Sequence, residues 1–89
     1  MASFRADWSL RPDARAAYDT LSEVDRAQVD RRIDFLCLNP YPDDEVKFAI
    51  DEGEEMTGVY FDDNEWALTY YIFDKGWFIE IWALAPIGR

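Results

Sequence analysis

Residues 39–48 read "NPYPDDEVKF", and they separate two halves of the chain that have different hydrophobic periods. Before this stretch, apolar residues recur every three or four positions, as on one face of a helix. After it they alternate with other residues, as in strands. The prolines end a helix, because the residue before a proline is pushed out of the α region. The stretch therefore predicts a helix end and turn, followed by a sheet.

Two helices are expected before this turn. The first begins at Pro12, because proline and an acidic residue such as Asp13 are both favoured in a first helical turn. The second runs from about residue 23 to residue 38, with Ser22 as its N-cap and Asp25 in the position of a capping box. One stripe of this helix is expected to face the sheet: Val29, Ile33, Leu36 and Cys37.

Strands are expected on both sides of the helices. Residues 2–10 alternate, with Ala2, Phe4, Ala6 and Trp8 on one side, which is typical of a half-buried strand. Four more strands are expected after the turn, at residues 46–50, 56–61, 65–73 and 77–84. The fold class is therefore α+β: an N-terminal strand, a two-helix hairpin and an antiparallel β-meander, in the order βααβββ(β), with the helices on one face.

Length and composition indicate one small domain spanning residues 1–89. With 17% aromatic residues, the core is expected to be aromatic. The single cysteine, Cys37, has no partner for an internal disulfide and is expected to be a buried thiol in a reducing compartment. The sequence contains no run of about twenty apolar residues and no signal peptide, so we expect a cytoplasmic protein that does not contact membranes.

The negative charge is concentrated in one part of the chain. Residues 1–32 contain six acidic and six basic residues, whereas residues 33–89 contain thirteen acidic and three basic ones and carry the whole net charge of −10. Such a field repels nucleic acid, whose binding depends on lysines and arginines that neutralise phosphates. We therefore expect a basic protein partner and no direct nucleic-acid binding.

Several kinds of site are excluded or disfavoured. The chain has no histidine, which excludes histidine triads and histidine zinc sites, and it has no glycine-rich phosphate loop. No carboxylate cluster has the spacing of a calcium loop, so no metal or cofactor is expected. Glu80 is expected on one strand face with Phe78, Trp82 and Leu84, either as a perturbed carboxylate or as a charge that prevents strand pairing.

Residues 14–42, "ARAAYDTLSEVDRAQVDRRIDFLCLNPYP", resemble the helical pair and asparagine–proline turn of the RelE/ParE superfamily, the toxins of bacterial type II toxin–antitoxin modules. Residues 65–89, "EWALTYYIFDKGWFIEIWALAPIGR", resemble its terminal hairpin and C-terminal arginine. The resemblance covers nearly the whole chain and implies the same α+β fold.

The resemblance also implies candidate catalytic residues. Ribonuclease members of the superfamily cut messenger RNA with lysines and arginines on the sheet, and Lys47 and Arg89 match two of these residues. Tyr70 matches a tyrosine that is common in the penultimate strand of the family. Where an arginine usually enters the penultimate strand, this chain has Trp66 and Ala67. We therefore do not expect RNA cleavage. The alternative interpretation of Lys47 and Arg89 is that they are ordinary surface charges.

Two functions are compatible with these features. In the first, the chain is a toxin-like protein of a toxin–antitoxin module that acts by binding a protein. In the second, it is a non-catalytic interaction domain on the same scaffold. In either case the partner, an antitoxin or a cellular target, is expected to be basic. The expected binding residues are aromatic anchors and steering carboxylates: Trp66, Trp77, Trp82, Asp43, Asp44 and Glu45.

Overall fold

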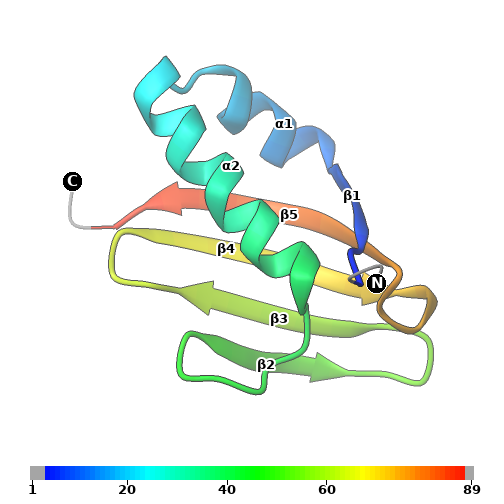
Figure 1. Ribbon diagram of the computed structural model, residues 1–89. Helices are drawn as coiled ribbons and strands as arrows, with labels where there is room; N and C mark the ends of the chain where they lie inside the picture. The colour runs from blue at the N-terminus through cyan, green and yellow to red at the C-terminus, as the bar shows by residue number, and fades with distance from the viewer. Residues whose placement is uncertain (1–3, 88–89) are drawn as a thin grey trace.

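A computed structural model describes residues 4–87, which form one sheet and two α-helices (Figure 1). The elements follow the chain as β1 (Asp7–Leu10), α1 (Pro12–Asp19), α2 (Glu23–Leu38), β2 (Lys47–Glu52), β3 (Thr57–Asp62), β4 (Trp66–Phe73), the 3₁₀ turn η1 (Asp74–Gly76) and β5 (Phe78–Pro86). The predicted α+β fold is confirmed.

Local signals place the helices where the sequence predicts them. Pro12 opens α1, and the Ser22 hydroxyl accepts a hydrogen bond from the Asp25 N–H at 3.1 Å, which caps α2. The backbone of Asn39 is extended, so α2 ends before Pro40. The expected stripe of α2 is buried against the sheet: Val29, Ile33, Leu36 and Cys37.

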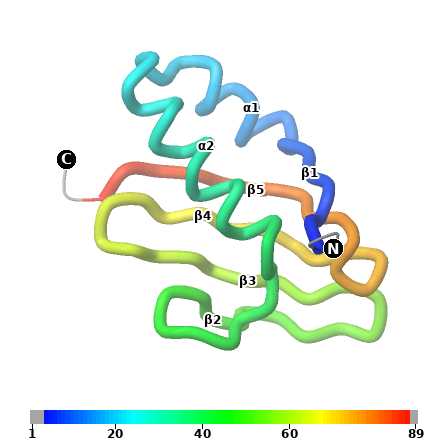
Figure 2. The backbone as a smooth tube through the Cα atoms, in the orientation of Figure 1, coloured from blue at the N-terminus to red at the C-terminus, as the bar shows by residue number. Residues whose placement is uncertain are grey.

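The strand order in the sheet is β1-β5-β4-β3-β2. Strands β2 to β5 form the predicted antiparallel meander, while β1 pairs with β5 in parallel (Figure 2). Alternation within a strand does not reveal its neighbour, so the parallel pair was not predictable from the pattern of residues 2–10. Both helices cover the same face of the sheet, and β2 is a free edge (Figure 1).

The N-terminal strand is shorter than predicted. It begins at Asp7, because the Ala6 N–H donates to the Cys37 carbonyl at the end of α2 instead of to a strand. Phe4 is exposed and packs on Trp77, with ring centroids 4.9 Å apart. Ala2 lies outside the described residues.

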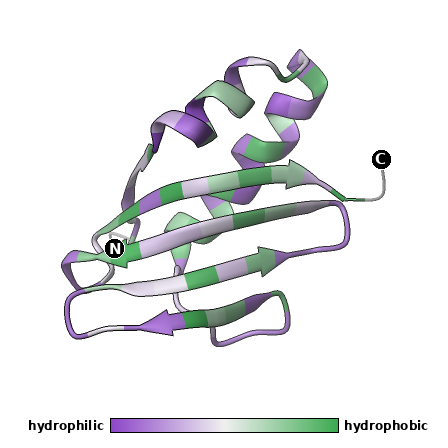
Figure 3. Ribbon diagram, turned by 180° about the vertical axis from the view of Figure 1, so that it is seen from behind, coloured by the Kyte–Doolittle hydropathy of each residue, from purple (hydrophilic) through white to green (hydrophobic). Residues whose placement is uncertain are grey.

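The core is mainly aliphatic, and the expectation of an aromatic core is wrong. Among the described residues, the buried aromatic side chains are Phe61, Trp66 and Tyr70. Most other aromatic residues of the strands occupy the alternate positions, whose side chains point to the opposite face. Figure 3 shows that face, which no helix covers. We call it the open face.

Candidate functional site

An aromatic surface forms at one end of the sheet, where three distant segments meet. Trp77, 59% exposed, follows the turn between β4 and β5, and Phe4 packs on it. The Tyr41 ring lies against Gly76, since a Cβ built on Gly76 would be 3.0 Å from Tyr41 Cε2. Gly76 has a φ of +94°, which together with this contact requires glycine. We call Phe4, Tyr41 and Trp77 the turn surface.

Two of the three expected steering carboxylates build the proline turn. Asp43 accepts hydrogen bonds from the Asn39 side-chain amide at 2.9 and 2.8 Å. Asp44 accepts from the Val46 and Lys47 N–H groups, at 3.1 and 3.0 Å, and pairs with the Lys47 ammonium at 3.0 Å. Burial opposes its ionisation, but the bonds from Lys47 and Val46 outweigh this and lower the pKa of Asp44. Glu45 is exposed.

The candidate catalytic residues Lys47 and Tyr70 lie beneath this turn. Lys47 is 3% exposed, and its Nζ donates to the Asn39 carbonyl at 2.6 Å, so its interpretation as surface charge is wrong. The reason is strand register, since Lys47 pairs with the inward-facing Phe61. The Tyr70 hydroxyl donates to the Pro40 carbonyl, and burial, with the nearby Asp44 and Asp43 charges, raises its pKa. Arg89 lies outside the described residues.

The three tryptophans of the expected anchor have different environments. Trp66 is fully buried, and its Nε1 donates to the Gln28 side chain at 2.9 Å, so its place among exposed anchors is corrected. It starts β4 at a position that faces α2, whereas Trp77 lies in a turn. Trp82 is half-buried on the open face.

Trp82 belongs to a cluster of side chains on the open face. The Trp82 ring centroid is 4.3 Å from the Tyr71 ring centroid, and the Arg11 guanidinium lies 3.9 Å from the Trp82 centroid. Trp82 Nε1 donates to Glu80 at 2.8 Å, so this carboxylate has a specific partner. The expected grouping of Glu80 with Leu84 is wrong, because an irregularity in the β4–β5 register at Trp82 turns Leu84 toward the core.

The open face receives no basic side chain from its own strands. Lys47 is the only lysine or arginine within β1 to β5, and it points inward. Arg11, which precedes α1, reaches the open face from the sheet edge, where its guanidinium makes a cation–π contact with the Trp82 ring. Preorganised donors stabilise the negatively charged transition state of RNA cleavage, and within residues 4–87 the basic side chain placed on this face is Arg11.

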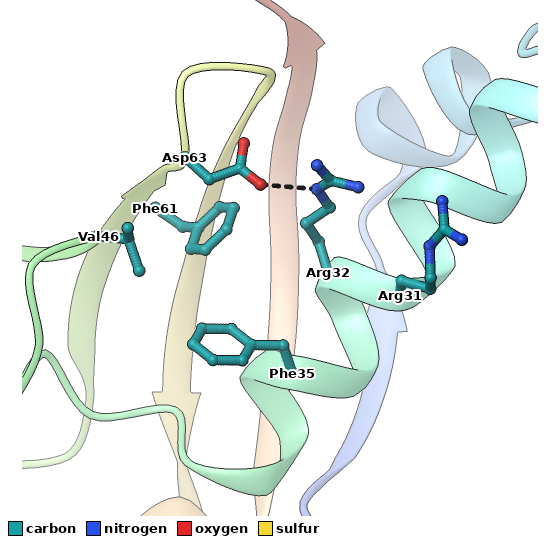
Figure 4. A pocket seen from close by; sticks show the side chains of 6 residues that line it. All are labelled: Arg31, Arg32, Phe35, Val46, Phe61 and Asp63. Carbon is teal, nitrogen blue, oxygen red and sulfur yellow. Dashed lines mark hydrogen bonds and ion pairs between the residues drawn. The ribbon is translucent and has the colours of Figure 1, made fainter.

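A groove lies between α2 and the edge of the sheet, and sequence reasoning missed it. It is open to solvent, has a volume of about 390 Å³ and is lined by Arg31, Arg32, Phe35, Val46, Phe61 and Asp63 (Figure 4). We call it the α2 groove. The sequence signal was Phe35, an aromatic residue of α2 outside the buried stripe.

Other chemistry has little support in the described residues. Within residues 4–87, no three histidine, cysteine or carboxylate side chains are grouped to hold a metal ion. Burial raises the pKa of the Cys37 thiol to about 11, which makes it a poor nucleophile. None of the described helices is long and apolar enough to cross a membrane.

Comparison with known proteins identifies the fold. No protein-family model matches the sequence, and no curated protein matches it. A chain of the archaeal RelE–RelB complex from Pyrococcus horikoshii is similar in structure, with a TM-score of 0.75, 16% identity, and coverage of 96% of this chain and 98% of that one. For a chain of the intact E. coli RelBE toxin–antitoxin complex, the TM-score is 0.64 at 10% identity, with 94% and 99% coverage. The isolated E. coli RelE toxin gives 0.62 at 13% identity, with 94% and 86% coverage. The chain therefore has a RelE-like fold.

Proposed function

We propose that this chain is a RelE-like toxin of a toxin–antitoxin pair, and that it acts by binding proteins and not by cutting RNA. The RelE-like fold supports the first part, since similar structures include an intact toxin–antitoxin complex. The open face supports the second part, because its strands supply no basic side chain there. Because one fold can host several functions, the proposed function has to be argued from the residues of the site as well as from the fold.

The proposed binding site is the turn surface, and one contact carries it. Because the Tyr41 ring lies against Gly76, the acidic turn of residues 39–48 is brought next to the exposed Trp77. Exposed carboxylates flank this aromatic patch: Asp7, Asp43 and Asp74. Buried aromatic side chains supply most of an interface's affinity, and charges at its rim accelerate association. The arrangement suits a basic partner segment with an apolar anchor.

Expression in a bacterial host tests the function. We expect inducible expression to slow growth, co-expression of the protein encoded beside it to restore growth, and sequenced messenger RNA to contain no new specific cleavage sites. Specific cleavage that disappears in an Arg89→Ala variant would contradict the proposal. Harmless expression, with a partner that still binds, would favour the second function, an interaction domain without toxicity.

Binding kinetics test the site. With the purified partner, we expect Trp77→Ala to raise Kd about tenfold or more, because anchor residues contribute at least about 1–2 kcal/mol. Raising the salt concentration past physiological strength shortens the Debye length below about 8 Å and should slow association several-fold, while dissociation hardly changes. Glu23→Gln, at the opposite end of α2, is the control and should leave the kinetics unchanged. Unchanged affinity in Trp77→Ala would move the site elsewhere.

A further inference from the structure

The α2 groove has an apolar floor that the core does not need. Phe61 is buried at its base, and the Phe35 ring stands beside it with centroids 6.0 Å apart. Phe35 is nevertheless 44% exposed, although α2 already buries a complete stripe against the sheet. Val46 closes the opposite side (Figure 4). The two rings contact each other, and the exposed part of Phe35 leaves an apolar surface in the groove on which a further apolar side chain can pack.

The rim of this groove is held rigidly by an ion-pair network. Arg32 Nε donates to Asp63 Oδ2 at 2.8 Å, and its Nη2 donates to Glu65. Arg32 is only 15% exposed, so its charge is both fixed and compensated. Lys47, 5.0 Å from the Phe35 ring, is likewise paired with Asp44.

Arg31 differs from these cations. It lines the same groove, is exposed, and forms no salt bridge with any residue between 4 and 87. The neighbouring Asp34, three residues on, is paired with Arg5. Among the cations that line the α2 groove, Arg31 is therefore the one whose charge no salt bridge within residues 4–87 compensates. Its five N–H donors suit a carboxylate, which it can bind through two parallel hydrogen bonds.

We infer that the α2 groove binds a partner segment in which a large apolar side chain is next to a carboxylate. The apolar side chain packs against the exposed Phe35 ring, beside Val46 and Phe61, and the carboxylate pairs with Arg31. A volume of about 390 Å³ accommodates one or two such side chains. This segment has the opposite charge to the one expected at the turn surface, so the inference does not rest on the proposed function.

Nuclear magnetic resonance on the full ¹⁵N-labelled chain tests the inference with three capped hexapeptides. The probe is Ser-Gly-Leu-Phe-Glu-Glu, and its two controls have glutamine or lysine in place of both glutamates. We expect the acidic peptide to shift the Phe35, Val46 and Phe61 amides. It should bind about two- to fivefold tighter than the glutamine peptide, which is the contribution of an exposed ion pair. The lysine peptide should bind most weakly.

Two variants separate the charge from the groove. Arg31→Gln should abolish the preference for the acidic peptide and leave folding unchanged, because Arg31 is exposed and forms no salt bridge with any residue that the structure describes. Arg15→Gln, which removes an exposed arginine from α1, is the matched control and should keep the preference. Phe35→Ser should weaken binding of all three peptides.

Three outcomes would overturn the inference. The first is a preference for acid that survives Arg31→Gln, and the second is a set of shifts that lies outside the groove. The third is self-association of the chain that Arg31→Gln abolishes, measured by sedimentation, because the occupant would then be a second copy of this chain. Failure at the groove leaves the toxicity and Trp77 experiments unaffected.

Discussion

Tyr70 and Tyr71 are neighbours on β4, yet they belong to the two different faces of the sheet. Tyr70 is fully buried under the helices, and its hydroxyl donates a hydrogen bond to the Pro40 carbonyl. Tyr71 packs on Trp82 at a tilt of 42° on the open face, next to Gly58, where a Cβ would come within 2.8 Å of the Tyr71 ring. The comparison teaches that residue type does not assign a role in this sheet. The inner aromatics pack in the core, whereas the outer ones pack on one another on the open face.

The largest expected effect on stability comes from replacing Trp66, which is buried in the core, and not from replacing Trp77, which is exposed. Trp66→Ala should lower the free energy of unfolding by about 3–5 kcal/mol, because it leaves a cavity in the core. Trp77→Ala should lower it by less than about 1 kcal/mol, because this ring is exposed and packs mainly on Phe4. Urea unfolding monitored by circular dichroism measures both. Equal losses would mean that the turn surface is part of the core.

Alkaline pH should have the next largest effect, through Tyr70 and Cys37. Burial raises the pKa of Tyr70 above its ordinary value of 10.0 and that of Cys37 from 9.0 to about 11. At pH values below these ordinary pKa values, both groups keep their protons in the folded and in the unfolded chain. As the pH rises past 9 for Cys37 and past 10 for Tyr70, the unfolded chain releases them first. Stability should therefore fall, by up to about 1.4 kcal/mol per pH unit for each group.

Variants at the two tyrosines sharpen this prediction. Tyr70→Phe should reduce the loss of stability above pH 10, and at neutral pH it should cost about 1–3 kcal/mol, because the Pro40 carbonyl loses its partner. Tyr71→Phe should retain the alkaline loss and change neutral stability by less than about 0.5 kcal/mol. Urea unfolding between pH 7 and pH 11 gives both quantities. The comparison fails if the two variants behave alike.

The smallest expected effect concerns Arg11, which covers Trp82 on the open face. Arg11→Ala should cost about 0.5–1 kcal/mol, which is typical of an exposed cation–π contact. It should also leave Trp82 more accessible to a neutral quencher such as acrylamide. Arg15→Ala, on the exposed side of α1, is the control. Unchanged stability and quenching would show that Arg11 does not cover the ring in solution.

The candidate site was only partly predictable from the sequence. Exposed anchors were expected among Trp66, Trp77 and Trp82, with no choice between them. Trp66 is buried and Trp77 is exposed, although both lie at the start of a predicted strand and nothing local separates their burial. Lys47 was identified by resemblance, but its burial depends on pairing with Phe61, fourteen positions along the chain. The α2 groove combines residues from α2, β3 and the loops beside β2 and β3, so no single stretch of sequence contains it.

The sequence by itself determined the elements. Proline at the start of α1, the serine cap of α2, the proline after it and the change of period at residues 39–48 act within a few residues of one another. Only the tertiary structure decided the parallel pairing of β1 with β5, the register irregularity that turns Leu84 inward and the contact of Tyr41 with Gly76. These features depend on strand register and packing between distant segments, where the free energy comes from partners that local sequence does not specify.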